Sequence, residues 1–216
     1  MKDLAKYIEH TLLKQDAAKE EFLKLFDEAK KHNFLGVCVN PLYVALAKEH
    51  LKDSDVKIVT VVGFPLGANR SDIKALEAQK AVEDGADEID MVINVSKIKD
   101  KDWEFVKKDI EAVKKACQDK ALKVILETDL LTKDEIAKAC EICVEAHADF
   151  VKTSTGFVKN GEGAKAQDVA LMAKIVKPHG LRVKASSGIR DREKALLMIE
   201  AGADRLGTSS GCAIVA

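Results

Sequence analysis

The sequence has few aromatic residues and very few prolines. Aromatic side chains make up 5% of the 216 residues, and there are three prolines. Scarce aromatics weigh against a protein that stacks on nucleic-acid bases. The few prolines, together with the lack of any linker-like or low-complexity segment, predict one domain over residues 1–216.

The chain also lacks an excess of charge of either sign. Its formal net charge is −1, so neither nucleic acid nor an anionic membrane surface is an expected partner. No apolar run approaches the length that spans a bilayer, and the N-terminal MKDLAKYIEH has no apolar signal-peptide core. We therefore expect a cytoplasmic protein.

Cysteines and histidines give no clear redox or metal motif. The five cysteines are an odd number and are predicted to be free thiols. Cys140 and Cys143 form a CxxC, but they recur at helical spacing with Ile136, which favours a packed helix face. The five histidines show no ligand spacing, so no metal or other cofactor is expected, and His10 is predicted to pack or hydrogen-bond.

Strand-like and helix-like segments alternate along the chain, which predicts βαβ units and a parallel sheet. The predicted helices include EEFLKLFDEAKKH, SDIKALEAQKAVEDG, WEFVKKDIEAVKKAC and DREKALLMIEAG. The predicted strands are YIEHTLL, GVCVN, KIVTVVG, EIDMVIN, KVILET, DFVKTS, RVKASS and DRLGTS. Their number favours an α/β fold of the (β/α)₈ TIM-barrel type, with a short N-terminal extension and a truncated last helix. An open, flavodoxin-like sheet is the alternative.

A weak internal repeat supports the barrel. The segments EDGADEID, EAHADFVK and EAGADRLG each join a helix end to a new strand through an Ala-Asp step. Similar junctions about two βα units apart are expected in a closed barrel of repeating units.

Alternation along the strands places ionisable side chains inside the barrel. Asp90, Lys152 and Lys184 share the polar parity of their strands, and Glu127 is a further candidate. Lys57 and Lys123 begin their predicted strands and are expected in water. Lys152 and Lys184 instead lie mid-strand before Ser/Thr/Gly turns, near the end of a barrel where active sites form.

These residues indicate covalent catalysis. Two adjacent ammonium groups disfavour each other's charged form, so we expect a lowered pKa for at least one of the lysines. A neutral Lys152 could form a Schiff base with a carbonyl, while Lys184 and Asp90 transfer protons.

Three Ser/Thr/Gly turns follow late strands and indicate a phosphate site. Hydroxyls, N–H groups and glycines at such turns can surround an anion, and barrels often bind phosphate after strands seven and eight. A small phosphorylated carbonyl compound is the expected substrate. The candidate binding residues are Thr155, Gly156, Ser187, Gly188, Ser209 and Ser210.

The segments IEHTLLK, VCVNP, VVGFPLG, EIDMVINV, LETDLLT, DFVKTSTGF, VKASSGIRD and RLGTSSG resemble the deoxyribose-phosphate aldolases, in order and over nearly the whole chain. The resemblance implies a class I aldolase that reversibly cleaves 2-deoxy-D-ribose 5-phosphate to D-glyceraldehyde 3-phosphate and acetaldehyde. It implies Lys152 as the Schiff-base lysine, Lys184 as the second lysine and Asp90 as the acid of the proton relay. Homodimers are frequent among similar enzymes.

The chain departs from the family pattern at several positions. Ser187 stands where the family often has a second glycine, and Glu9, Gln15 and Ala18 depart from the common DHTLLKPDAT. The C-terminal tyrosine tail of some members is not found here. These departures affect the expected rate and phosphate preference more than the reaction class.

Two alternatives are another lysine-dependent barrel aldolase with a different aldehyde pair and a non-catalytic phospho-sugar-binding barrel. Retention of Lys152, Lys184 and Asp90 argues against the second. A further hypothesis is that Cys38, near the end of the second predicted strand, reacts with aldehydes.

Overall fold

The computed structural model describes residues 3–216, whose strands close into a parallel barrel. The eight strands pair in chain order, and β8 pairs with β1 to complete the ring. This confirms the predicted (β/α)₈ barrel and rules out the open sheet. The strands are β1 (Ile8–Leu12), β2 (Gly36–Val39), β3 (Lys57–Val62), β4 (Glu88–Val92), β5 (Ala121–Ile125), β6 (Phe150–Lys152), β7 (Arg182–Ser186) and β8 (Arg205–Thr208).

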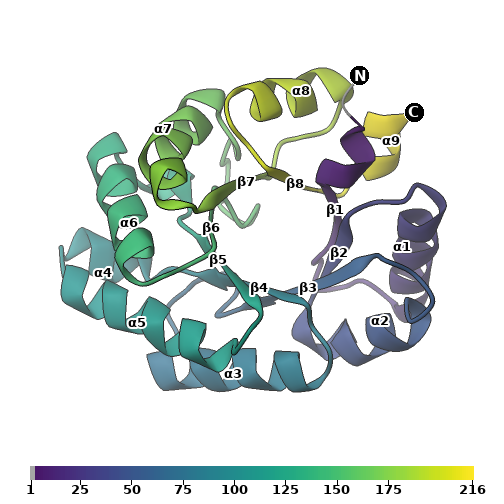
Figure 1. Ribbon diagram of the computed structural model, residues 1–216, viewed down its shortest axis with the longest axis horizontal. Coiled ribbons are helices and arrows are strands. Elements are labelled where there is room, and N and C mark those ends of the chain that lie inside the picture. The colour runs from purple at the N-terminus through teal and green to yellow at the C-terminus, as the bar shows by residue number, and fades with distance from the viewer. Residues whose placement is uncertain (1–2) are drawn as a thin grey trace.

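Helices surround the barrel (Figure 1). The α-helices are α1 (Lys19–Lys31), α2 (Val44–His50), α3 (Ser71–Glu83), α4 (Val95–Lys99), α5 (Trp103–Ala116), α6 (Lys133–Glu145), α7 (Ala166–Val176), α8 (Arg192–Glu200) and α9 (Gly211–Val215). Short 3₁₀ helices are η1 (Leu4–Tyr7), η2 (Pro41–Tyr43), η3 (Thr128–Leu130) and η4 (Lys177–His179). Within residues 3–216, no helix is both long and apolar enough to cross a membrane.

Helices η1 and α9, the first and last helices described, meet beside β1. Helix α9 has only five residues, as predicted for a truncated last helix. Helix η1 forms the short N-terminal extension and contacts α9, so the first and last helices lie together in Figure 1. Leu4 and Ala5 of η1 are buried, which anchors this extension in the hydrophobic core.

The predicted alternation of the strands is confirmed. Ile89 and Met91 of β4 belong to the main hydrophobic core between barrel and helices, whereas Asp90 between them is buried on the opposite face. On β6, Val151 packs outward in the same core and Lys152 lies inside. The barrel interior therefore carries the charged residues. A small apolar cluster of Leu13, Cys38, Val59 and Val61 lies on the same interior parity.

The repeated Ala-Asp step fastens pairs of strands at their N-terminal ends. In each case the aspartate precedes an even-numbered strand, and its Oδ2 accepts a hydrogen bond from a backbone N–H of the preceding odd-numbered strand. The pairs are Asp87 with Ile58, Asp149 with Leu122, and Asp204 with Val183, at 2.8, 2.8 and 2.9 Å.

The expectation that Lys123 lies in water is wrong. Strand β5 begins at Ala121, before the predicted start, so Lys123 lies within the strand and faces the interior with 0% exposure. Carboxylates inside the barrel offset the cost of burying its charge. Lys57, by contrast, begins β3 and is exposed as predicted.

The CxxC motif has the packing role that its helical spacing indicated. Cys140 and Cys143 are buried in the hydrophobic core on α6. Burial raises the pKa of the Cys140 thiol to about 12 and the pKa of Cys143 well above its ordinary value. Both are therefore protonated at neutral pH and poor nucleophiles.

Candidate active site

A buried cluster of charged side chains occupies the centre of the barrel. Asp90 on β4 accepts hydrogen bonds from lysines on the next three strands, β5, β6 and β7. The distances from a lysine Nζ to an Asp90 carboxylate oxygen are 2.9 Å for Lys123, 2.8 Å for Lys152 and 2.7 Å for Lys184. The structure thus brings the predicted Asp90, Lys152 and Lys184 together and adds Lys123, which the sequence interpretation had placed elsewhere.

Two glutamates complete this cluster. Glu9 of β1 accepts a hydrogen bond from Lys184, and Glu88 of β4 pairs with Lys123 at 2.6 Å. Both are buried. With Asp90 and the three lysines they give equal numbers of opposite charges, which is the condition under which buried ions are tolerated. We call these six residues, Glu9, Glu88, Asp90, Lys123, Lys152 and Lys184, the charged cluster.

Glu9 and Glu88 were not predicted as site residues. Glu88 has the same strand parity as Asp90, which was a usable signal. Glu9 stood out only as a departure from a family motif, and its inward parity on β1 became clear only from the strand pairing with β8.

Electrostatics within the cluster keep Lys184 charged. Burial alone would lower its pKa, but the Asp90 and Glu9 carboxylates outweigh burial and raise it. The sequence predicted a lowered pKa for at least one of the two lysines, and Lys184 is not that lysine, because Asp90 and Glu9 stabilise its charge. Burial would likewise raise the pKa of Asp90, yet the ammonium groups around it, Lys123 first, hold it well below its ordinary value. At neutral pH, Asp90 is an anion and Lys184 a cation.

A cavity of about 350 Å³ opens at the C-terminal ends of the strands. Its lining includes one member of the charged cluster, Lys152. The six predicted binding residues also line it: Thr155, Gly156, Ser187, Gly188, Ser209 and Ser210. The structure therefore gathers the predicted lysine and the three predicted turns around one space.

Hydrogen bonds tie the turn after β6 to the turn after β7. The Thr153 hydroxyl donates to the Ser186 carbonyl at 3.1 Å and accepts from the Ser186 N–H at 3.0 Å. The Ser186 hydroxyl donates to the Ser154 carbonyl at 2.6 Å. These bonds fix the two turns relative to each other beside Lys152.

The turn after β8 is held in a similar way. The Thr208 hydroxyl donates to the carbonyl of Ile189 at 2.7 Å and accepts from the Ser210 N–H at 2.9 Å. Thr208 therefore links the segment after β7 to the Ser209–Ser210 turn, and all three turns form one connected rim.

Glu127, a candidate from strand parity, lies beside the rim. It has a left-handed backbone, with φ of 59°. Its carboxylate accepts a hydrogen bond from the Thr155 N–H at 3.1 Å and another from the Thr155 hydroxyl. Burial raises the pKa of Glu127, although the bonds from Thr155 oppose this. Through these two hydrogen bonds Glu127 holds the turn at Thr155 in place.

The Ser187 position explains why glycine suits this turn. Ser187 has φ of +73°, and the following Gly188 has φ of +74°. A Cβ at Gly188 would lie 2.7 Å from the carbonyl oxygen of Glu162, so only glycine fits there. Ser187 has room for its side chain, but it occupies a conformation that costs an L-residue energy.

Two cations at the cavity were missed by the sequence interpretation. Lys14 follows β1 and Arg190 follows the Ser187–Gly188 turn, and both line the cavity with exposed side chains. Single exposed basic residues in loops have no distinctive sequence signal. Only the closed barrel brings these two to the same rim.

Cys38 lies inside the barrel but has a fully buried thiol. Burial raises its pKa, and this outweighs the nearby Lys184 ammonium, which would lower it. A protonated, buried thiol is a weak nucleophile. Its reaction with aldehydes stays a hypothesis, to be tested by measuring protein mass after aldehyde exposure.

Comparison with known proteins finds similarity over almost the entire chain. Residues 4–215 match the family described as DeoC/LacD family aldolase. The deoxyribose-phosphate aldolase of Thermococcus gammatolerans is 57% identical over 217 residues, covering 99% of this chain and 95% of the relative. That of Lactococcus lactis is 56% identical over 210 residues, covering 97% and 94%. A solved tetrameric deoxyribose phosphate aldolase from Aeropyrum pernix has a TM-score of 0.91 at 34% identity, covering 98% and 89%.

Proposed function

The chain belongs to the DeoC/LacD family of aldolases, and we propose that it reversibly cleaves 2-deoxy-D-ribose 5-phosphate to D-glyceraldehyde 3-phosphate and acetaldehyde. Its relatives named deoxyribose-phosphate aldolase support this substrate. So does a cavity that combines a lysine with hydroxyl-rich turns and two exposed cations.

The observation that carries the proposal is the position of Lys152. It is 3% exposed, hydrogen-bonds to Asp90 at 2.8 Å and lines the cavity. A carbonyl carbon that enters the cavity can therefore reach Nζ of Lys152. The other members of the charged cluster lie deeper in the barrel than this nitrogen. We assign Lys152 as the nucleophile.

The proposed reaction begins when Lys152 passes a proton of its ammonium group to a base and its free amine attacks C1 of the open-chain sugar. Loss of water gives a protonated Schiff base. A base takes the proton of the C3 hydroxyl, the C2–C3 bond breaks, and its electron pair moves into the iminium to form an enamine. Glyceraldehyde 3-phosphate leaves, the enamine is protonated at C2, and water releases acetaldehyde and Lys152. We assign these proton transfers to Asp90 and Lys184, because Asp90 hydrogen-bonds to both Lys152 and Lys184.

The turns around the cavity would bind the phosphate. Backbone N–H groups and hydroxyls at Gly156, Gly188 and the Ser209–Ser210 turn can surround an anion, with Lys14 and Arg190 adding positive charge. Binding the phosphate at the rim would direct the other end of the sugar toward Lys152, which lies at the strand ends below.

The experiment that tests this function is borohydride trapping. The protein is mixed with 2-deoxy-D-ribose 5-phosphate, reduced, and mapped by mass spectrometry. We expect a reduced adduct on Lys152 that is missing from a Lys152→Met control. Binding of the sugar by folded protein without any adduct would overturn the aldolase chemistry and favour a non-catalytic phospho-sugar-binding barrel. Product analysis separates this reaction from that of an aldolase with another aldehyde pair.

We further propose that the chain forms a homo-oligomer, needs no metal for this reaction and acts in the cytoplasm. The tetrameric Aeropyrum pernix relative supports self-association, though not a particular number of subunits. Light scattering would give the assembly state. Activity that survives dialysis against a chelator would support the metal-independent reaction, and its loss would contradict it.

A further inference from the structure

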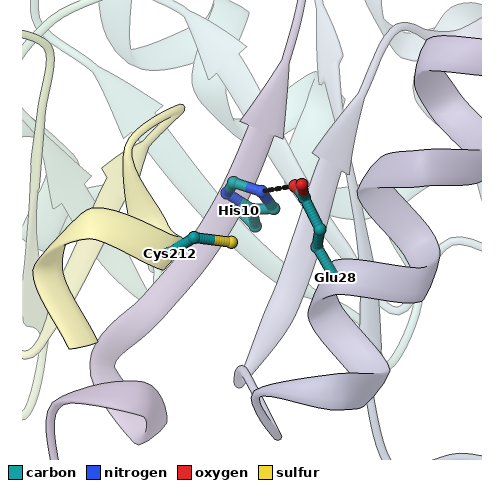
Figure 2. A group of neighbouring side chains, drawn as sticks. All are labelled: His10, Glu28 and Cys212. Carbon is teal, nitrogen blue, oxygen red and sulfur yellow. Dashed lines mark hydrogen bonds and ion pairs between the residues drawn. The ribbon is translucent and has the colours of Figure 1, made fainter. Parts of the chain in front are cut away.

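A second group of reactive side chains lies outside the barrel wall, away from the charged cluster. His10 comes from β1, Glu28 from α1 and Cys212 from α9. Figure 2 shows the three side chains converging from these elements. Each offers one nitrogen, oxygen or sulfur atom, and these three atoms lie within 4.8 Å of one another.

His10 and Glu28 form the firm part of this group. Nε2 of His10 lies 2.9 Å from Oε2 of Glu28. The His10 residue is 3% exposed, and its Nδ1 has no hydrogen-bond partner within residues 3–216. The predicted hydrogen-bonding role of His10 is thus confirmed, and Nε2 is the nitrogen that faces Glu28.

Close packing of α9 brings Cys212 to this pair. A Cβ at Gly211 would lie 3.0 Å from His10 Nδ1 and 3.0 Å from the Phe34 ring. The absence of a side chain at Gly211 therefore lets the first turn of α9 rest against β1. The next residue, Cys212, then extends toward His10 and the Glu28 carboxylate (Figure 2).

We propose that His10, Glu28 and Cys212 form a binding site for a zinc ion. Imidazole nitrogen, carboxylate oxygen and thiolate sulfur are the protein ligands that Zn²⁺ uses, and three of them leave a fourth position for water. The combination with sulfur favours Zn²⁺ over Mg²⁺ or Ca²⁺, which prefer oxygen ligands.

The His10–Glu28 pair requires only a small adjustment, and the Cys212 sulfur, now within 4.8 Å of the other two ligand atoms, would lie about 3.5 Å from them around a zinc ion. At Zn–N and Zn–O bond lengths of about 2.0 Å, tetrahedral ligand atoms lie roughly 3.3 Å apart. The present Nε2–Oε2 distance is 2.9 Å, so the ion would replace the shared proton and separate the two atoms slightly. Because no group within residues 3–216 accepts from Nδ1, His10 lacks the usual outer hydrogen bond, and we expect a zinc affinity about 10–100-fold below that of fully supported sites.

The site is open to solvent from one side. It borders a cavity of about 520 Å³, lined by His10, Glu28 and Cys212 among others. The same cavity reaches Ser209 and Ser210, which also line the proposed substrate cavity. An ion can therefore enter, and water can occupy the fourth position.

The chain between Ser210 and Cys212 links the zinc site to the substrate site. A bound ion would hold α9 to β1 and α1, and so restrict the Ser209–Ser210 turn at the start of that helix. A resulting change in KM for the phosphorylated sugar rests on the proposed function, whereas the zinc site itself does not.

The other cysteines are unsuitable ligands. Cys38, Cys117, Cys140 and Cys143 are buried, whereas Cys212 is partly exposed. A thiolate-to-metal absorption band from this protein would therefore come from Cys212. Cys212 should also be the cysteine that reacts fastest with an alkylating reagent.

The test uses Co²⁺ as a spectroscopic substitute for Zn²⁺ on the full chain. We expect one ion per chain, a sulfur-to-cobalt charge-transfer band, and displacement of Co²⁺ by Zn²⁺. Cys212→Ser should abolish the band and weaken Zn²⁺ binding at least about tenfold. His50→Gln is the matched control. His50 of α2 pairs with Asp27 of α1, the helix that also carries Glu28, at 2.9 Å, but it does not belong to the group of His10, Glu28 and Cys212.

A second measurement needs no variant. Zn²⁺ should slow alkylation of Cys212 in the unaltered protein, as read from the modified peptide by mass spectrometry. Binding without a charge-transfer band, a band that survives Cys212→Ser, or alkylation at an unchanged rate with Zn²⁺ present would each overturn the proposal. If zinc does not bind at this site, borohydride trapping on Lys152 is unaffected. The two proposals can therefore be overturned independently.

Discussion

Asp90 and Lys123 lie in register on the neighbouring strands β4 and β5, and Lys123 Nζ donates to Asp90 Oδ1 at 2.9 Å. Lys152 and Lys184 bond to the other carboxylate oxygen. One oxygen of Asp90 therefore bonds to Lys123, which has a structural role, and the other oxygen bonds to Lys152 and Lys184, which we assign to the chemistry. Changes at Asp90 should affect stability and catalysis together.

We expect Asp90→Asn to lower kcat at least about 100-fold, because proton transfer by a positioned side chain contributes roughly 10²–10⁴-fold. Removing a carboxylate from a buried ion pair should also lower the free energy of unfolding by about 3–5 kcal/mol. Steady-state kinetics and urea unfolding measure the two effects. The matched control is Asp109→Asn, which breaks the buried 2.7 Å pair with Lys74 between α3 and α5. It should lose similar stability with little change in kcat; an equal loss of kcat would mean that Asp90 acts only through folding.

Glu88 should make stability depend on pH in acid. Burial would raise its pKa, but Lys123 and Lys57 outweigh burial and lower it from 4.5 to about 2. The unfolded chain therefore binds this proton first as the pH falls. The contribution, about 3 kcal/mol, is fully present above pH 4.5 and is lost progressively as the pH falls toward about 2.

Glu88→Gln should flatten the fall in unfolding free energy between about pH 4.5 and 2, measured by urea unfolding at each pH. Its stability at neutral pH should be lower, because Lys123 loses a partner. The control Glu83→Gln removes an exposed carboxylate of α3 and should leave most of the slope. An unchanged slope in Glu88→Gln would show that Glu88 does not carry it.

Glu127 should affect substrate binding through Thr155. Glu127→Gln replaces one acceptor oxygen with an amide NH₂, so one of the two bonds from Thr155 is lost. A lost hydrogen bond of about 0.5–1.5 kcal/mol corresponds to a roughly twofold to tenfold increase in KM for the phosphorylated sugar. We expect kcat to change little. Glu135→Gln, at the exposed start of α6, is the control, and a large fall in kcat with unchanged KM would instead give Glu127 a direct part in the chemistry.

Ser187→Gly should raise the free energy of unfolding by up to about 1 kcal/mol. The left-handed conformation at φ of +73° costs a non-glycine residue roughly 1–2 kcal/mol, partly offset by about 0.5–1 kcal/mol of extra backbone entropy for glycine. Lys101→Gly, at φ of 57° in an exposed turn, should give a similar gain without changing KM. Destabilisation by Ser187→Gly alone would show that the hydroxyl contributes more than the backbone costs.

The sequence predicted the barrel and most of the residues that gather at the candidate site, because alternation and turn chemistry are local signals. Asp90, Lys152 and Lys184 followed from strand parity, and the cavity rim followed from Ser/Thr/Gly turns at strand ends. Lys123 was misplaced because a strand boundary was wrong by a few residues, which turned a buried lysine into an apparently exposed one.

Residues brought together by tertiary packing were harder to predict. Glu9 joins the charged cluster only because β8 closes against β1. His10 and Cys212 lie near opposite ends of the chain and meet only when α9 packs on the outside of β1. Neither of these contacts corresponds to a recognisable residue spacing in a single sequence.

The aspartates that fasten strand pairs are not found at the first pair. Residue Leu35 stands at the corresponding place before β2, and the Ile8 N–H donates to Ala5 within η1. The β1–β2 pair therefore lacks the side-chain fastening of the other three pairs. We expect amide hydrogen exchange to be fastest here among the paired strands, so that reversible opening of the barrel begins where the two chain ends meet.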